Sequence, residues 1–269
     1  MPSETSRLRL DQLLVQRGLA ATRAQAERLI MAGEVLVNGQ PVTQPSRKAA
    51  IDVTLELKSP PRYVSRGGEK LAAALDAFAL DDLEGRICAD VGASTGGFTD
   101  CLLQHGATRV YAIDVGYGQL DWRLRQDPRV VSLERTNARY LEKLPEPVSF
   151  VTVDASFISL RLLLPVIAGW FPAEGGGAVA LIKPQFEAGR EEADRGKGVI
   201  RDPGVHARVL QEVLEFAGSL DFQPLGLIAS PILGPKGNRE FLAYLGYATS
   251  AVEVPLAALI AAVLDERAG

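Results

Sequence analysis

Residues 90 to 100 read Asp90-Val91-Gly92-Ala93-Ser94-Thr95-Gly96-Gly97-Phe98-Thr99-Asp100. An apolar run at 87–89 precedes them and is typical of a buried parallel strand, and the apolar spacing over 98–106 predicts a helix. Glycines in such a turn let a ligand approach the backbone, and the first N–H groups of the helix are free to bind it. The sequence therefore predicts a strand, a ligand-binding turn and a helix, in that order.

The same alternation continues along the chain. Further apolar runs predict strands at 110–115, 130–133, 150–154, 178–183, 225–229 and 240–249, helical patterns lie between most of them, and a last helix is expected at 256–264. This order predicts an α/β fold with a doubly wound, mostly parallel sheet and a ligand crevice at the carboxyl ends of its strands. The segment 187–198, rich in glycine and charge, predicts a loop that could close over that crevice.

The turn at 90–100 narrows the ligand to an adenosine compound. Its spacing is not the G-x-G-x-x-G of dinucleotide sites. Asp114 ends the second strand, where a carboxylate suits ribose hydroxyls. On these residues alone, S-adenosylmethionine and other adenosine ligands are about equally compatible.

Composition sets the outer bounds. A chain of 269 residues, 47% hydrophobic and 23% charged, is long enough for one large and one small globular domain. Cys88 and Cys101 both fall in elements expected to be buried, which favours a reducing, cytoplasmic setting without disulfides. The first nine residues lack an apolar segment and no apolar run is long enough for a membrane span. With two histidines only, we expect no metal site and no Ser-His-Asp triad.

Charge divides the chain unevenly. Residues 1–70 hold eleven Lys and Arg against seven acids, a balance of +4, so a net charge of -4 leaves -8 for the remainder. A small basic module joined to an acidic body suggests an anionic polymer as partner. A basic face that is merely solvated remains the alternative.

The basic module has the pattern of a compact α+β unit. A first helix with Leu10, Leu13 and Leu14 on one face ends at 17–18, and a second helix begins at the capping residue Thr22 and ends at Gly33. A strand at 35–37, an Asn-Gly hairpin turn at 38–39 and a second strand at 51–57 are expected to follow.

This module resembles the S4 RNA-binding domain. The resemblance lies in RLDQLL at 9–14, GLA at 18–20, TRAQA at 22–26, LI at 29–30, GEV at 33–35 and VNG at 37–39. It implies binding to structured RNA through backbone phosphates, and the arginines assigned to this contact are Arg9, Arg23, Arg28 and, beyond the module, Arg66. Arg23 and Arg28 are expected to project from the second helix, and simple solvation of both is the competing interpretation.

Four charged residues stand beside apolar elements of the body. Asp154 and Lys183 end two of the expected strands and Glu240 begins the last one. Lys70 falls in the first turn of an expected helix, where the helix dipole disfavours a cation. Each alone is more readily structural than catalytic, but together they can converge on one crevice.

With their surroundings, these residues closely resemble the TlyA family, S4-domain ribosomal RNA 2′-O-methyltransferases with an FtsJ-type catalytic domain. The motifs are SRGGEK at 65–70, DVGASTGG at 90–97, DVGYGQL at 114–120, ERTNAR at 134–139, DASFISL at 154–160, KPQFE at 183–187 and GNREF at 237–241. The resemblance spans almost the whole chain. It implies a Rossmann-like methyltransferase sheet, S-adenosylmethionine as methyl donor and cytidine ribose in the RNA of ribosomal subunits as acceptor.

Site residues follow from the same matching. The family's Lys-Asp-Lys-Glu tetrad corresponds to Lys70, Asp154, Lys183 and Glu240. The residues assigned to the cofactor are Asp90, Gly92, Ala93, Ser94, Thr95, Gly96, Gly97, Phe98, Asp114 and Asn137. Asn137 is the least secure of these, because related enzymes often have Asp there. The expected domains are 1–58, a linker at 59–66 that contains two prolines, and 67–269.

The tetrad predicts a division of labour. A ribose 2′-hydroxyl must lose its proton as it attacks the sulfonium methyl group, and Lys183 is the expected base. Asp154 is expected to orient Lys183 and the cofactor, Lys70 to hold the 2′-oxygen or a neighbouring phosphate, and Glu240 to orient the hydroxyl or a lysine.

Three other functions compete with this prediction. A non-catalytic RNA-binding ribosome-assembly factor would have no need of four charges at strand ends. The family also carries the label haemolysin, but the sequence contains neither the basic amphipathic helix nor the membrane span that would support a membrane-active protein. A small-molecule methyltransferase would leave the S4-like module without a role.

Overall fold

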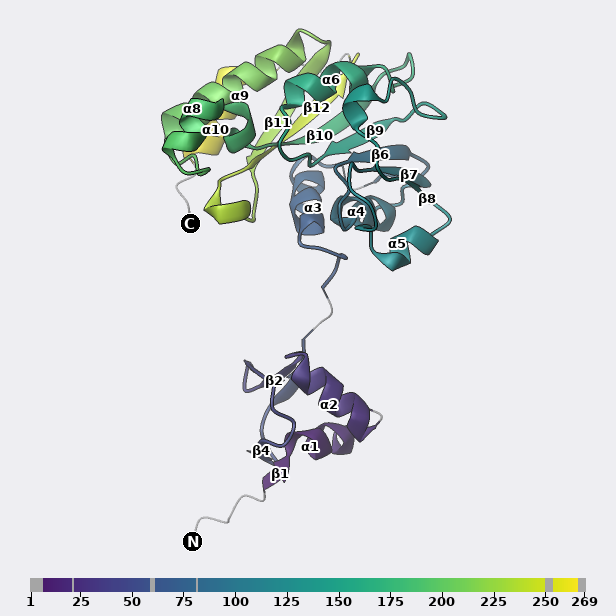
Figure 1. Cartoon of the computed structure of the whole chain (residues 1–269), viewed down its shortest axis with the longest axis vertical. Helices are drawn as coiled ribbons and strands as arrows, with labels where there is room; N and C mark the ends of the chain where they lie inside the picture. Colours follow the sequence, from purple (N-terminus) through teal and green to yellow (C-terminus); the bar gives the residue numbers. More distant parts are fainter. Residues whose placement is uncertain (1–6, 21, 59–60, 81, 250–253, 266–269) are drawn as a thin grey trace. The chain divides into compact units, whose positions relative to one another are not determined.

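A computed structural model of the chain describes residues 7–20, 22–58, 61–80, 82–249 and 254–265 (Figure 1). The chain divides between residues 61 and 62 into two compact units, and each is described by itself. This division falls inside the segment 59–66 that the sequence assigns to a linker. The exact domain limits of the sequence analysis stay a prediction.

The N-terminal unit combines two helices with short strands. Its elements are β1 (Arg7–Arg9), α1 (Leu10–Gln16), α2 (Arg23–Met31), β2 (Val35–Val37), β3 (Gln40–Val42), β4 (Lys48–Ala50) and β5 (Leu55–Leu57). β1 pairs with β4, and a second sheet has the order β3-β2-β5. Leu10, Leu13 and Leu14 of α1 pack with Ile30 of α2 in a shared core, as their spacing predicts.

Local signals set the limits of these elements. Thr22 Oγ1 accepts a hydrogen bond from Gln25 N at 3.2 Å, which confirms the predicted start of α2. Asn38 and Gly39 both have positive φ, as a tight hairpin turn between β2 and β3 requires. The predicted strand at 51–57 is wrong in its first half, because Val53 N bonds back to Ala50 O and forms a turn before β5 begins.

The C-terminal unit is built on one seven-stranded sheet. Its strands are β6 (Ile87–Val91), β7 (Arg109–Ile113), β8 (Val130–Leu133), β9 (Phe150–Val153), β10 (Gly176–Ile182), β11 (Phe222–Ala229) and β12 (Phe241–Tyr247). They lie in the order β11-β12-β10-β9-β6-β7-β8. Every pairing from β10 to β8 is parallel, whereas β12 runs antiparallel to both β10 and β11. The mostly parallel sheet that the sequence predicts is therefore confirmed, with β12 as the reversed strand.

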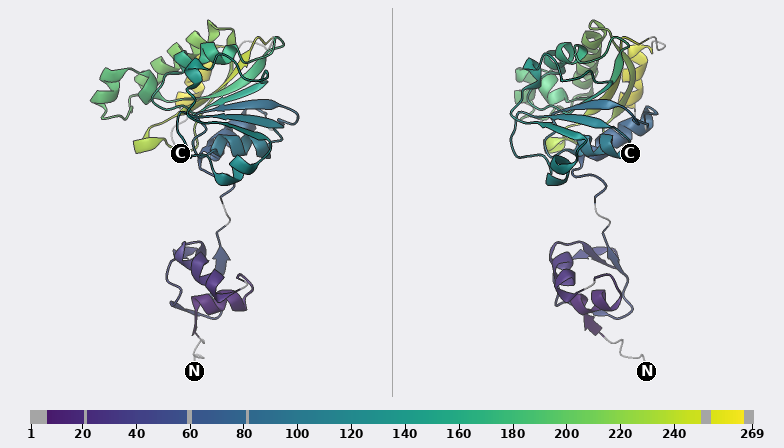
Figure 2. Two further views of the ribbon diagram at one scale, coloured as in Figure 1. Left: turned by 45° about the vertical axis from the view of Figure 1, so that its right-hand side comes forward. Right: turned by 90° about the vertical axis from the view of Figure 1, so that its right-hand side faces the viewer.

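Helices cover both faces of this sheet, as Figures 1 and 2 show. One face carries α3 (Gly67–Ala77), α4 (Gly97–Gln104) and α5 (Trp122–Gln126), and the other α6 (Leu160–Ala168), α9 (Pro203–Gly218) and α10 (Leu256–Asp265). The remaining elements are α7 (Pro184–Glu187), α8 (Arg190–Arg195) and two 3-10 turns, η1 (Ala138–Tyr140) and η2 (Pro235–Gly237).

The connections leaving the two central strands go to opposite faces. β6 and β9 are neighbours, but β6 leads into α4 and β9 leads into α6. In open α/β sheets a crevice forms at such a switch point, outside the carboxyl ends of the strands. This edge of the sheet is where the charged residues of the sequence analysis gather.

One expectation about this edge is wrong. The segment 187–198, predicted to be a loop, contains the last residue of α7 and all of α8. The carboxylate of Glu187 also fixes the start of this segment, since it accepts hydrogen bonds from Ser159 Oγ at 2.6 Å and Leu160 N at 2.8 Å.

Among the described residues, no helix is long and apolar enough to cross a membrane.

Candidate active site

Four elements bring the predicted tetrad to one edge of the sheet. Asp154 directly follows β9 and Lys183 directly follows β10, so both lie at carboxyl ends of parallel strands. Glu240 directly precedes β12, and the reversed direction of that strand places its first residue at the same edge. Lys70 comes from the first turn of α3. All four side chains line one cavity of about 340 Å³.

The tetrad is arranged as two ion pairs. Lys183 Nζ lies 2.6 Å from Asp154 Oδ1, and it also donates to Ala155 O at 3.0 Å and to Ser156 Oγ at 2.9 Å. The closest acceptors of this ammonium thus all come from one short segment, 154–156. The Asp154 side chain keeps 23% of its surface exposed, against 7% for Lys183, so this pair faces the cavity.

The second pair is more deeply enclosed. Lys70 Nζ lies 2.6 Å from Glu240 Oε2, and Glu240 has no exposed side-chain surface. A second donor, Gln185 Nε2, reaches Glu240 Oε1 at 3.3 Å. A buried carboxylate is stable only when its charge is balanced and its oxygens are hydrogen-bonded, and Glu240 meets both conditions.

The glycine turn after β6 is locked to Asp154 by steric fit. Gly92 has φ of +85°, which favours glycine. A Cβ atom at this position would stand 2.7 Å from Asp154 O, too close for any side chain. The turn and the end of β9 therefore touch backbone to backbone, and this contact sets the wall between two adjoining cavities.

The second cavity measures about 620 Å³ and shares Gly92, Ser94, Asp154 and Ser156 with the first. Its far wall contains Asp114 and Asn137. The Asp114 carboxylate accepts from Ser94 N at 2.8 Å and Gly116 N at 2.7 Å, so it shapes the turns on either side of the cavity.

Of the ten residues assigned to the cofactor, the structure brings eight to the walls of these two cavities. They are Gly92, Ala93, Ser94, Thr95, Gly97, Phe98, Asp114 and Asn137. Gly96 lies outside both walls: it begins α4 with φ of +99°, and a side chain there would run into Leu120 and Leu124. Its contribution is conformational.

Asp90 also stays away from the cavities. Its side chain is fully buried below the glycine turn and accepts from Thr99 Oγ1 at 2.7 Å and Thr152 Oγ1 at 3.0 Å. Burial raises the pKa of Asp90 to about 7, and the two threonine hydroxyls act in the opposite direction. Asp90 thus ties α4 to β9 rather than facing a ligand.

The arginines assigned to RNA are placed differently from one another. Arg9 and Arg23 both bind Asp11, at 2.7 Å and 3.0 Å, and the Asp11 side chain is fully buried. Hydrogen bonds from Arg9, followed by those from Arg23, lower the pKa of Asp11 to about 2. Arg23 and Arg28 are both exposed on α2, as the sequence predicts, but Arg23 is also held by its ion pair with Asp11. Arg66 lines the tetrad cavity in the other unit.

Sequence reasoning missed three polar residues of the site. Ser156 accepts from Lys183, Gln185 donates to Glu240, and Asn238, 2% exposed, holds the turn before Glu240. All three lie inside or beside the motifs that carried the resemblance. A signal was available, because each lies two positions from a charged tetrad residue.

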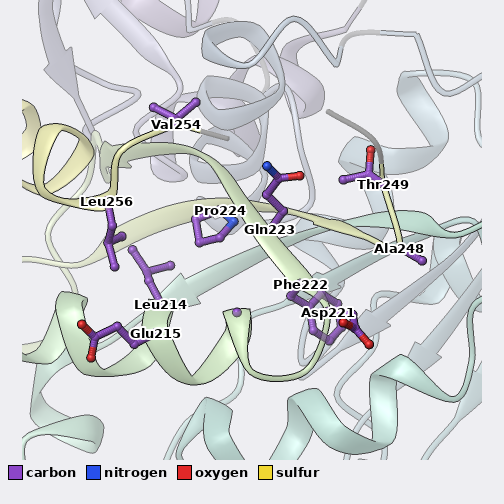
Figure 3. Close-up of a pocket in the computed structure, with 11 residues that line it drawn as sticks. Leu214, Glu215, Asp221, Phe222, Gln223, Pro224, Ala248, Thr249, Val254 and Leu256 are labelled. Carbon is purple, nitrogen blue, oxygen red and sulfur yellow. The ribbon is translucent and has the colours of Figure 1, made fainter. Parts of the chain in front are cut away.

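A further cavity of about 670 Å³ lies at the opposite edge of the sheet, where β11 begins and β12 ends (Figure 3). Its walls include Phe222, Gln223 and Pro224 of β11 and Leu214 of α9. Because strand β12 runs the full depth of the sheet between this cavity and Glu240, the two sites are separate.

The sheet order, the reversed strand β12 and the glycine turn beside an acidic strand end together define a Rossmann-like methyltransferase. The FtsJ-like methyltransferase family matches residues 63–247, and the S4 domain matches residues 8–51. The chain belongs to the FtsJ-like methyltransferases, in the TlyA branch that carries an S4 domain. The fold class inferred from the sequence is confirmed.

Three relatives illustrate this membership. The 16S/23S rRNA (cytidine-2′-O)-methyltransferase TlyA of Mycobacterium tuberculosis is 47% identical over 89% of this chain and 90% of its own length. Hemolysin A of Brachyspira hyodysenteriae is 41% identical over 88% of this chain and 99% of its own. A solved structure from Streptococcus thermophilus, described as a hemolysin, is 46% identical, covers 97% of this chain and 95% of its own, and superposes with a TM-score of 0.73.

Proposed function

We propose that the protein transfers the methyl group of S-adenosylmethionine to the ribose 2′-hydroxyl of a cytidine in ribosomal RNA. The observation that carries this proposal is the pair of ion pairs, Lys183–Asp154 and Lys70–Glu240, beside a cavity walled by the glycine turn. The choice of cytidine and of ribosomal RNA as acceptor follows the activity named for the Mycobacterium tuberculosis relative.

The larger cavity fits an adenosine-type donor. Each Asp114 oxygen accepts one backbone N–H, which leaves a second lone pair on each for ribose hydroxyls. Asn137 Oδ1 accepts from Arg139 N at 3.1 Å, and no described residue accepts from the Asn137 amide N–H groups, so these can donate to an adenine ring nitrogen. Asn can thus serve where related enzymes have Asp. S-adenosylmethionine bound here would supply an electrophilic methyl group.

The donor's methyl end would then lie at the shared wall of the two cavities, next to the tetrad. With the donor bound, the 2′-oxygen would attack the methyl carbon in line as the carbon–sulfur bond breaks and S-adenosylhomocysteine leaves. The hydroxyl proton would pass to Lys183 Nζ, which has to be in its neutral amine form when the reaction begins. Asp154 stabilises the resulting ammonium. Lys70 faces the ribose or its phosphate, and holding the two reactants in line can contribute roughly 7 to 11 kcal/mol.

An RNA substrate accounts for the presence of the N-terminal S4 unit. An S4 domain with Arg9, Arg23 and Arg28 supplies cations for backbone phosphates, which position a protein on folded RNA without reading its sequence. A 2′-hydroxyl inside a helix is not accessible to the cavity, so the target nucleotide has to be unpaired or flipped out.

The test is transfer of radiolabelled methyl from S-adenosylmethionine to unmethylated small and large ribosomal subunits. Wild type is compared with Lys183→Ala and with Lys143→Ala, which replaces an exposed lysine outside the site. We expect label on RNA with wild type and Lys143→Ala, and none above background with Lys183→Ala, while calorimetry shows S-adenosylmethionine bound by all three.

Two outcomes would contradict the proposal. Undiminished transfer by Lys183→Ala would remove Lys183 from the reaction. If the wild type transfers no methyl group but still binds the subunits, the result would favour a non-catalytic ribosome-assembly factor over an enzyme. Mapping the labelled nucleotide then decides whether the acceptor is a cytidine.

A further inference from the structure

The carboxylate of Glu240 is held by a different donor on each of its two oxygens. Lys70 Nζ donates a hydrogen bond to Glu240 Oε2 at 2.6 Å, and Gln185 Nε2 donates one to Glu240 Oε1 at 3.3 Å. Glu240 is 1% exposed and Gln185 is 9% exposed, so water does not substitute for either contact. Each carboxylate oxygen therefore has its own protein donor, and the plane of the carboxylate is fixed.

A glycine closes the third side. Gly234 has φ of −70° and ψ of −175°, values that any residue can adopt, so its backbone does not call for glycine. A Cβ atom at this position would overlap Glu240 Oε1 and Cδ. The requirement for glycine at 234 is thus steric, and it is set by the position of the Glu240 carboxylate.

Gln185 is a costly residue for its place. Its Oε1 is buried and has no hydrogen-bond partner among the described residues. A buried acceptor without a partner destabilises the fold, and an apolar side chain of the same size would avoid that cost. Gln185 lies on α7, directly beyond Lys183 and Pro184, and is absent from the walls of the tetrad cavity. Direct ligand contact therefore does not explain an amide at 185, whereas its hydrogen bond to Glu240 does.

We propose that Gln185 is a positioning residue for methyl transfer: it fixes Glu240 on the side opposite Lys70, in a seat that Gly234 keeps open. The short helix α7 then links both halves of the tetrad, since it begins after Lys183 and carries Gln185 to Glu240. With Glu240 held, the Lys70 ammonium keeps one direction toward the cavity. This inference rests on the proposed methyl transfer.

The first test removes the amide and keeps the size. Gln185→Leu is compared with wild type and with Gln223→Leu, a matched change in the cavity at the opposite edge of the sheet (Figure 3). Loss of a residue that orients a reacting group typically costs about 10- to 100-fold in activity, and we expect kcat to fall by that factor. The Kd for S-adenosylmethionine should stay at the wild-type value, and Gln223→Leu should match wild type. The melting temperature of Gln185→Leu should fall, because Glu240 Oε1 loses its donor, so kcat is measured well below that temperature.

The second test asks whether Gln185 acts through Glu240. In a double-mutant cycle, Gln185→Leu added to Glu240→Gln should reduce kcat no further than Glu240→Gln alone. Gln185→Glu places a second carboxyl beside the first, and because two adjacent carboxyls resist joint ionisation, the acid limb of the pH–kcat profile should move to higher pH. An unmoved acid limb would mean that the ionisation of Glu240 does not control kcat, which would contradict the proposal.

The outcomes separate this inference from the function on which it rests. Absence of methyl transfer by the wild type would overturn the proposed function. If the wild type transfers the methyl group and Gln185→Leu has the same kcat, only the role of Gln185 is overturned. The same holds if the effects of the two substitutions in the double-mutant cycle are additive. If Gln185→Leu binds no S-adenosylmethionine, the residue supports the fold and the inference is equally overturned.

Discussion

The surroundings of Lys183 set what its side chain can do. Its closest acceptors, the Asp154 carboxylate, Ala155 O and Ser156 Oγ, all come from the segment that follows β9. Asp154 is partly exposed and lies on the side of the cofactor cavity. The nitrogen is therefore aimed by neighbours that are fixed to the glycine turn, and a bound donor would lie beside it.

A charge-conserving substitution separates two roles for this lysine. Arginine stays charged at all accessible pH values, so Lys183→Arg can pair with Asp154 but cannot accept a proton. If Lys183 is the base, this variant should lose about 10²- to 10⁴-fold in the rate of methyl transfer while still binding S-adenosylmethionine. Single-turnover rates measure the loss. A rate within a few-fold of wild type would assign Lys183 a purely electrostatic role.

The buried Asp90 makes stability depend on pH. Its pKa is raised from 3.8 to about 7 by burial, so between about pH 4 and 7 the folded state binds a proton that the unfolded state has released. Stability from this residue is fully present below pH 4 and is lost as pH rises through about 7. Asp90→Asn should therefore gain stability relative to wild type at pH 8 and show little gain at pH 4. Urea unfolding at the two values measures the difference, and an equal effect at both would contradict it.

Among the structural elements, the turns rather than the strands fix the positions of the site's side chains. The turn from Gly234 to Glu240 is anchored by Asn238, whose amide donates to Gly198 O at 2.9 Å and Pro235 O at 3.0 Å and accepts from Ile200 N at 3.0 Å. This turn connects β11 to β12, and it delivers Glu240 to the tetrad.

Removal of this anchor should cost both stability and rate. Asn238→Ala leaves the buried amide of Ile200 without its partner, at about 1 to 3 kcal/mol before relaxation, and the half-buried carbonyl of Gly198 loses its donor as well. We expect a lower melting temperature and a fall in kcat, because Glu240 is no longer held in place. The Kd for S-adenosylmethionine should be unchanged, since the cofactor cavity contains neither residue. Wild-type kcat in a destabilised Asn238→Ala would show that the turn serves the fold alone.

Gly92, in the glycine turn after β6, and Gly118, in the segment after β7, offer a matched pair of substitutions. Gly92 and Gly118 both have positive φ, at +85° and +73°, but only at Gly92 does a Cβ meet another atom, Asp154 O. Gly92→Ala should abolish S-adenosylmethionine binding, because the turn has to move away from β9. Gly118→Ala carries the same kind of backbone strain, roughly 1 to 2 kcal/mol, without the overlap. Calorimetric titration of both variants is the measurement, and equal losses would show that strain rather than fit decides.

At the scale of the whole molecule, two units contribute separate parts of one activity. The tetrad and the cofactor cavity belong entirely to residues beyond 61, and the S4 arginines entirely to residues before it. Charge differs between the units as well: residues 1–61 hold eight Lys and Arg against six acids, a balance of +2, so the net charge of -4 leaves -6 for residues 62–269. Binding of RNA and binding of the methyl donor should therefore be separable by mutation.

Removal of S4 arginines should weaken RNA binding alone. Arg23→Ala combined with Arg28→Ala should lower affinity for the ribosomal subunit and reduce the salt dependence of binding by about one unit of slope for each phosphate that is no longer neutralised. Affinity for S-adenosylmethionine should remain that of the wild type. Filter binding over a range of salt concentrations measures the slope. An unchanged slope would mean that these arginines face solvent only.

The sequence by itself determined the features that depend on local pattern. Apolar periodicity indicated the strands and helices, Thr22 and Gly33 marked the limits of α2, and the glycine turn at 90–100 lay where a strand meets a helix. These signals act over a few residues, because caps, turns and amphipathic faces are set by neighbours in the chain. The motifs also indicated which four charges belong together.

The sequence analysis expected Asp154 beside Lys183, but only the tertiary structure decided that Glu240 pairs with Lys70. Lys70 and Glu240 are 170 residues apart in sequence, and their contact depends on the reversal of β12 and on the seat formed by Gln185 and Gly234. Likewise, long-range packing buried Asp90 beneath the turn that it was expected to line. Partners across a sheet are chosen by strand order and steric fit, and neither leaves a periodic pattern in the sequence. The residues of the site could therefore be predicted, whereas the contacts that Glu240 makes with Lys70 and Gln185 could not.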